Sequence, residues 1–192
     1  MSDRLISVAP RDETGTLSAA DLERLCDAAG AALDLCGVSH AAIDLAIVGD
    51  EAMHALNRRW LDHDYPTDVL SFLLEEGGGI DETDGGGWAV APREGQIIVN
   101  PDYAAREAAG HDWPVQGAPG HELSASLREL MLYVAHGTLH VCGYDDQTDA
   151  QRAVMRSAEA RALAACGVAV PPGHAGPVGH GGSGVSGGER SG

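Results

Sequence analysis

Residues 134–146 read VAHGTLHVCGYDD, and our interpretation of the whole chain starts from this stretch. His136 and His140 stand four residues apart, in a segment whose apolar residues have helical spacing. Both imidazoles therefore project from one helix face, about 6 Å apart along the axis. Gly143 follows, and glycine readily takes the left-handed conformation that ends a helix. The spacing predicts a helix that presents two metal ligands and then stops.

The acidic pair Asp145 and Asp146 follows this stop, and either carboxylate can turn back toward the two imidazoles. Two neutral imidazoles and one carboxylate leave an open position on a tetrahedral ion, as in catalytic zinc sites. The chemistry predicted for such a site is hydrolysis by metal-activated water. A single helical histidine is more often held by ordinary hydrogen bonds. Here the pair, the glycine and the acidic turn together favour a metal, with the choice between Asp145 and Asp146 left open.

The composition is that of one folded domain with a Gly-rich end. A chain of 192 residues is long enough to bury its apolar surface without disulfides. We predict a single metallohydrolase domain over residues 1–170 and a disordered tail rich in Gly, Pro and Ser over 171–192. Residues 75–94 are rich in Gly and acidic side chains, and we predict that they form a mobile loop between two strands.

The chain is strongly acidic and contains no lysine. Its formal net charge of −17 excludes a protein that coats nucleic acid nonspecifically, because phosphate contacts need cationic side chains. An enzyme with one local basic groove stays open. No apolar run reaches the roughly 20 residues that cross a membrane, and the N-terminus lacks the basic and apolar segments of a secretion signal. We expect a cytoplasmic protein with reduced cysteines and no membrane partner.

The periodicity of apolar residues divides the chain into strands and helices. Strands are predicted at residues 5–9, 40–48, 67–72 and 96–99. Helices are predicted at residues 19–35, 50–60 and 101–110, from 122 through the two histidines, and from 148 to 166. We expect Asp50 to cap the second helix and Trp60 to lie on its core side. The long loop between the third and fourth strands favours antiparallel pairing.

These elements predict an α+β fold: a small mixed β-sheet flanked by about five helices, with the metal site at the C-terminal end of a central helix. The ligand spacing HxxxHxxGxxD is zincin-like. The chain shows neither a GxxxxGK[ST] phosphate loop nor a GxGxxG dinucleotide motif.

Two stretches resemble the YbeY family of bacterial endoribonucleases, also called rRNA maturation factors. YPTDVLSF (65–72) is similar to the family's PT[DN]VLSF strand, and HGTLHVCGYDD (136–146) is similar to its HGxLHLxGYDH metal motif. The resemblance covers most of residues 5–168. It implies a metal-dependent, single-strand-directed endoribonuclease of small-subunit rRNA maturation and ribosome quality control. Its implied partners are single-stranded RNA, the small ribosomal subunit and assembly factors, with no DNA partner.

Carried over residue by residue, the resemblance assigns His136 and His140 as the first two metal ligands and puts Asp146 where the third histidine stands. The implied ion is zinc, one per chain. Aspartate is a zinc ligand at about 2.0–2.2 Å, and a hard carboxylate also admits manganese or iron. These three side chains, acting through the bound metal, are the predicted catalytic residues.

The chain departs from the family at an arginine that precedes the PT[DN]VLSF strand, where Leu61 stands instead. If that arginine contacts phosphate or stabilises the transition state, another side chain must replace it. Arg58, Arg59 and His63 are the nearest in sequence, and we retain Arg59 and His63 as candidate catalytic residues. Gln96 stands where the family usually has an acid.

Two other functions stay open. A zinc peptidase has this ligand spacing, but it needs a glutamate base directly after the first histidine, where this chain has Gly137. A noncatalytic ribosome-assembly factor with a structural metal is the stronger rival, because the missing arginine and the acidic charge argue against RNA cleavage. That rival predicts lower stability without metal, by linkage, and no cleavage activity.

Overall fold

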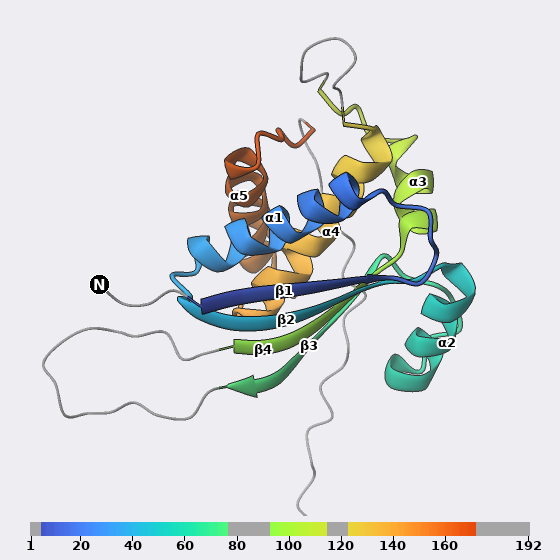
Figure 1. The fold of residues 1–192 in the computed structure, drawn as a ribbon, viewed down its shortest axis with the longest axis horizontal. Helices are drawn as coiled ribbons and strands as arrows, with labels where there is room; N and C mark the ends of the chain where they lie inside the picture. Colours follow the sequence, from blue (N-terminus) through green and yellow to red (C-terminus); the bar gives the residue numbers. More distant parts are fainter. Residues whose placement is uncertain (1–4, 77–92, 115–122, 172–192) are drawn as a thin grey trace, which may run out of the picture.

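The computed structural model describes residues 5–76, 93–114 and 123–171. Most of the predicted loop at 75–94 and nearly all of the predicted tail at 171–192 lie outside these ranges, so both stay predictions. The described elements, in chain order, are β1 (Leu5–Asp12), α1 (Ala19–Leu35), β2 (His40–Ile47), α2 (Asp50–Leu61), β3 (Val69–Glu76), β4 (Arg93–Val99), α3 (Pro101–Ala108), α4 (Ala125–Val141) and α5 (Asp149–Ala165). The predicted α+β class is confirmed (Figure 1). None of the described helices is long and apolar enough to span a membrane.

The four described strands form one mixed sheet in the order β1-β2-β4-β3. β1, β2 and β4 are parallel, while β3 runs antiparallel to β4, as expected for two strands joined by a long loop. β1 and β3 are the edges of the sheet. β1 contains Pro10, which cannot donate to a ladder and is tolerated on an edge strand. The opposite edge, β3, is one of the two strands under α4.

Different helices cover the two faces of the sheet (Figure 1). α1 and α4 pack on one face, where Ile43 and Ile97 of the strands meet Leu33 and Val134 of the helices. α5 packs on α1 and α4 and forms a further layer. α2 covers part of the opposite face through Met53. The alternation of side chains along each strand therefore separates a helix-covered core from a second, smaller apolar cluster.

α4 carries the two motif histidines and is buried on nearly every side, with each residue from 127 to 139 buried. Its start is capped by Ser124, whose hydroxyl accepts a hydrogen bond from the Leu127 amide at 3.1 Å. Gly137 lets the helix lie directly on the sheet, since a Cβ there would come within 3.1 Å of methyl groups of Ile97 and Val69. This close contact sets the height of the neighbouring His136 above β3 and β4.

Two local predictions are wrong. Asp50 does not cap α2, because the cap position is Gly49 and the Asp50 carboxylate instead accepts hydrogen bonds from Arg106 and Asn100. Trp60 is 58% exposed. α2 covers only a small apolar cluster of the sheet, and Trp60 meets this cluster at the partly buried Phe72.

Three of the four described strands, β1, β3 and β4, are longer than the sequence patterns suggested. β1 continues through Pro10 to Asp12, where its residues pair with the buried end of β2. β3 and β4 extend toward each other, to Glu76 and from Arg93. Pairing with a neighbouring strand, which a local pattern does not report, explains these extensions. All four cysteines are free and partly buried.

Candidate metal centre

The structure brings the three predicted ligands together at the end of α4. The Nε2 atoms of His136 and His140 lie 2.9 Å apart. Asp146 Oδ2 lies 4.0 Å from His136 Nε2, and Asp146 Oδ1 lies 4.0 Å from His140 Nε2. One donor atom from each residue falls within a span of 4.8 Å. His136 is only 4% exposed, so the cluster has a buried inner side.

A Schellman turn returns Asp146 to the helix end. The Gly143 amide donates to the His140 carbonyl at 2.9 Å, and the Tyr144 amide donates to the Leu139 carbonyl at 3.0 Å. These two bonds define the motif and require a left-handed residue, which Gly143 supplies with φ of 94°. The predicted glycine stop is therefore present, and it turns the chain back on the face that carries both imidazoles.

Each imidazole is oriented by a hydrogen bond at its other ring nitrogen. His136 Nδ1 lies 2.7 Å from Glu159 Oε1, and His140 Nδ1 lies 3.0 Å from the carbonyl oxygen of Tyr144. A carbonyl and a carboxylate accept hydrogen bonds, so both Nδ1 atoms carry the proton and both Nε2 atoms of the neutral rings present a lone pair. Two Nε2 lone pairs that point at one place beside a carboxylate form a donor set suited to a divalent first-row cation.

The distances fit a single ion. A tetrahedral cation about 2.0–2.1 Å from its ligands spaces the ligand atoms about 3.3 Å apart. The measured separations of 2.9 Å and 4.0 Å lie on either side of this value. Burial lowers the pKa of His140, and the adjacent His136 lowers it further. A neutral imidazole is the form that binds metal, so the electrostatics agree with the geometry.

Glu159 is a functional candidate that the sequence analysis missed. It lies on α5, is 1% exposed, and accepts the Nδ1 proton of His136. Its second oxygen, Oε2, has no hydrogen-bond partner among the described residues. A buried carboxylate with one unpaired oxygen is costly, and carboxylates that hold ligating histidines are common at metal sites. The available sequence signal was an acid inside the buried stripe of Met155, Ala158 and Ala162.

Asp145 and Asp146 have different roles in the turn. The Asp145 carboxylate accepts hydrogen bonds from the Asp146 amide at 2.8 Å and from Gln151 Nε2 at 3.1 Å. It therefore ties the turn to the start of α5. Arg152 also holds the turn, donating to the carbonyl of Asp146 at 3.0 Å. Of the two acids, Asp146 is the one in the three-ligand cluster.

A further buried carboxylate, Asp68, lies near the cluster at the start of β3. It is 7% exposed and accepts hydrogen bonds from the Thr67 hydroxyl and the Val69 amide, each at 2.8 Å. Burial raises the pKa of Asp68, while its hydrogen bonds with Thr67 and Val69 oppose the rise. Asp68 therefore adds a buried carboxylate directly before β3, one of the strands under α4.

Arg59 and His63, the two candidate replacements for the family arginine, each lie next to an aromatic ring. The guanidinium of Arg59 lies 5.4 Å from the centre of the Trp60 ring. The ring of His63 stacks on Tyr65 at 5.3 Å. Neither residue belongs to the three-ligand cluster. Their predicted catalytic role therefore stays a prediction.

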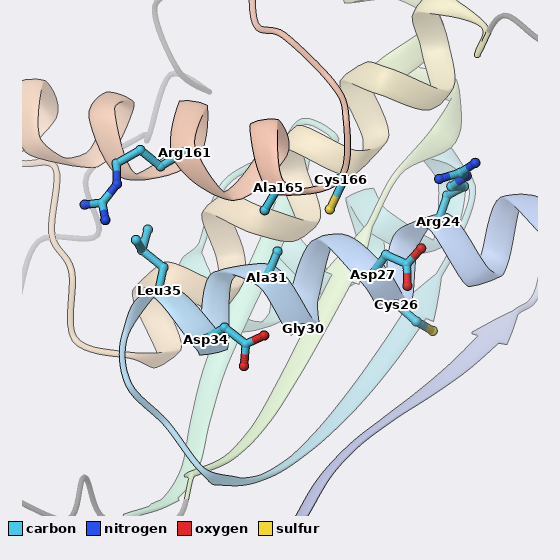
Figure 2. Close-up of a pocket in the computed structure, with 10 residues that line it drawn as sticks. All are labelled: Arg24, Cys26, Asp27, Gly30, Ala31, Asp34, Leu35, Arg161, Ala165 and Cys166. Atoms are coloured by element: carbon cyan, nitrogen blue, oxygen red, sulfur yellow. The ribbon is translucent and has the colours of Figure 1, made fainter. Parts of the chain in front are cut away.

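A separate hollow lies between α1 and α5 (Figure 2). Its charged lining residues are Arg24, Asp27, Asp34 and Arg161, whose formal charges cancel. None of the three clustered ligands lines it. The three side chains that could bind a cation therefore lie at the C-terminal end of α4, outside this hollow.

Three protein ligands with oriented imidazoles are an arrangement that mononuclear metal-dependent hydrolases use. The model of the family Endoribonuclease YbeY matches residues 11–167. The chain belongs to this family, which confirms the resemblance drawn from residues 65–72 and 136–146 and, with it, the RNA-hydrolase class.

Relatives named endoribonuclease YbeY are similar in sequence to this chain over most of their length. The relative from Rhodopirellula baltica is 36% identical over 159 residues, 82% of this chain and 70% of the relative. The relative from an Anaeromyxobacter species is 38% identical over 90% of this chain and 78% of the relative. For Moorella thermoacetica the identity is also 38%, over 77% of this chain and 85% of the relative.

Proposed function

We propose that this chain is a metal-dependent endoribonuclease that cleaves single-stranded RNA in small-subunit rRNA maturation and ribosome quality control. The observation that carries the proposal is the convergence of donor atoms from His136, His140 and Asp146 within 4.8 Å. Family membership supports RNA as the substrate, because the relatives bear the name endoribonuclease. The proposal includes the cytoplasm as location and the small ribosomal subunit with its assembly factors as partners.

Zinc is the proposed ion, one per chain, and a carboxylate ligand also admits manganese or iron. His136 and His140 would hold the ion through Nε2, and Asp146 through its carboxylate. A cation bound there supplies Lewis-acid chemistry: it makes water acidic enough to react near neutral pH and withdraws charge from a phosphoryl oxygen.

The chain's own residues orient the imidazoles and bind the RNA. Glu159 and the Tyr144 carbonyl keep both Nδ1 protons in place, so the imidazoles stay correctly oriented through the reaction. Arg59, with His63 as the alternative, is proposed to contact a phosphate of the bound RNA strand in place of the arginine missing at Leu61. The substrate is single-stranded because an unpaired backbone and splayed bases can approach a buried cluster that a duplex cannot enter.

The peptidase alternative conflicts with the packing of α4. The position that carries the glutamate base in zinc peptidases is Gly137, which lies against Ile97 and Val69 of the sheet. A glutamate side chain there would collide with these strand residues. The assembly-factor alternative shares the metal and differs only in catalysis, so an experiment must separate the two.

The test is elemental analysis of the purified protein, with cleavage of single-stranded RNA assayed on the same samples. We expect one zinc per chain in the wild type, and loss of both metal and cleavage in His140→Ala and Asp146→Ala. Asp145→Ala is the matched control, since it removes a neighbouring carboxylate that lies outside the cluster. It should keep the metal.

Duplex RNA and single-stranded DNA of the same sequence are the substrate controls, and both should stay intact. Metal retained in Asp146→Ala would move the third ligand elsewhere. Bound metal without cleavage of any single-stranded RNA would favour the noncatalytic assembly factor.

A further inference from the structure

Two aromatic pairs lie near the loop between α2 and β3, Trp60 with Phe72 and His63 with Tyr65, and we call them together the aromatic surface. Trp60 is 58% exposed and Tyr65 is 38% exposed. Trp60 packs on Phe72 of β3 with ring centres 6.0 Å apart. His63 and Tyr65 stack nearly parallel, with an angle of 13° between their planes. Ring contacts thus hold both pairs, and Trp60 and Tyr65 are each partly exposed to solvent.

The loop that carries His63 and Tyr65 is tied to the protein interior. Asn57 is 1% exposed, and its amide donates to the carbonyl of Tyr65 at 2.7 Å. The loop leaves α2 through Asp62 in the left-handed conformation, with φ of 58°. The hydrogen bond from Asn57 restrains the loop at Tyr65, and a restrained group loses less freedom when a flat ligand binds.

Trp60 and Phe72 lie on the face of β3 opposite to α4, the helix that carries His136 and His140. Val69 and Ser71 of β3 face Gly137, next to His136. Leu70 and Phe72 point to the other face, where Trp60 packs. Because β3 is the last strand of the sheet, a flexible chain can pass around its outer edge and reach both faces.

The charge of the protein favours bases over phosphates as the recognised groups. The chain has 12 cationic side chains, all of them arginines, against 29 acids. Phosphate contacts are therefore scarce, whereas stacking of bases on aromatic rings needs no net charge. Arg58 and Arg59 are exposed at the end of α2, and Arg59 lies over the Trp60 ring. This surface combines stacking planes with local positive charge.

We propose that Trp60 and the His63–Tyr65 pair form a base-stacking subsite for single-stranded RNA that crosses the edge of β3 from the metal centre. The inference rests on the proposed function, because it names how the same substrate is bound. It predicts affinity that depends on the presence of bases more than on the number of phosphates.

The experiment compares two fluorescent probes of equal length on the zinc-loaded full chain. One is a 2′-O-methyl oligoadenylate, checked to be intact afterwards, and the other is an abasic phosphodiester. We expect wild type to prefer the oligoadenylate. Trp60→Ala and Tyr65→Ala should each weaken that binding by about 5- to 150-fold, the effect of losing one stacked base, and leave binding of the abasic probe unchanged.

Trp60→Phe and Tyr65→Phe are the matched controls, because each keeps an aromatic face and should keep most of the affinity. Wild type should also show quenching of tryptophan fluorescence on binding, and Trp60→Phe should lose this quenching. With two exposed arginines at the surface, the slope of log K against log salt should be about −1.4, from about −0.7 per phosphate contact.

Equal affinity for the two probes, or unchanged oligoadenylate binding in folded Trp60→Ala and Tyr65→Ala, would overturn the inference and leave this surface to a protein partner. Thermal unfolding of each variant checks folding. RNA cleavage without base-dependent binding would contradict the stacking subsite alone. Base-dependent binding without cleavage would contradict the proposed endoribonuclease and leave the subsite standing.

Discussion

Replacement of Glu159 should weaken metal binding more than it weakens the fold. Its Oε1 accepts the Nδ1 proton of His136 at 2.7 Å, while Oε2 makes no hydrogen bond with the described residues. Removing such a carboxylate typically lowers metal affinity by about 10- to 100-fold, or about 1.4–2.7 kcal/mol. We expect that loss in Glu159→Ala.

Glu159→Gln should lower the zinc affinity less than Glu159→Ala does. Its amide oxygen still accepts the proton but without charge, and a neutral hydrogen bond is about half as strong as a charge-assisted one. A loss of about 1 kcal/mol, or about 5-fold in affinity, should follow. A zinc affinity that falls in the order wild type, Glu159→Gln, Glu159→Ala would indicate that Glu159 positions His136.

The assay is competition for zinc with a chromophoric chelator at neutral pH, together with urea unfolding with and without zinc. By linkage, the stabilisation at saturating zinc should fall by the same free energy as the affinity. Glu129→Gln is the matched control, because Glu129 is equally buried and accepts from Trp113 and His111, about 10 Å along α4 from His136. It should lower stability and leave zinc affinity unchanged. Wild-type zinc affinity in folded Glu159→Ala would refute the reasoning.

Three further predictions concern the scaffold. Ser124→Ala removes the cap of α4 and should lower the free energy of unfolding by about 1 kcal/mol in urea. Gly137→Ala should also destabilise by about 1 kcal/mol, because overpacking against two branched side chains outweighs the gain in helix propensity, and calorimetry measures it. Arg106 hydrogen bonds to Asp50 and lowers the pKa of that carboxyl, so the bond stabilises the fold above about pH 4. Arg106→Ala should therefore lose stability at neutral pH, and its difference from wild type should vanish in acid.

Features encoded within one turn of chain could be predicted from the sequence. Ser18 and Thr148 each form a capping box with a residue three positions later in the sequence, and α1 has the expected bounds. The glycine stop at Gly143 and the shared face of His136 and His140 are equally local. Each depends on residues no more than about four positions apart, which is the range of helical hydrogen bonding.

Features that depend on distant partners could not be read in this way. Asp50 has the chemistry of a cap, but Arg106 lies 56 positions away and takes its carboxylate. Glu159 is separated from His136 by 23 positions, and only the packing of α5 on α4 brings them together. Trp60 continues the apolar stripe of α2, but it packs only on the edge strand β3, through Phe72, and stays exposed. A helical stripe reports which residues share a face and not how far the partner surface extends.

Compared with a histidine, the aspartate at position 146 lowers the formal charge of the metal centre by one. This change should lower the electrostatic contribution of the centre to RNA affinity. With a divalent cation, the carboxylates of Asp146 and Glu159 bring the formal charge to zero, whereas an imidazole at position 146 would leave one positive charge. A neutral centre attracts a phosphodiester weakly, in a chain whose net charge is already −17. Asp146→His should therefore bind oligoadenylate more tightly, with a salt slope steeper by about 0.7, equivalent to one added phosphate contact. Fluorescence anisotropy over a salt series measures both. An unchanged slope in a variant that still holds one zinc would mean that the charge of the centre does not contribute to RNA affinity.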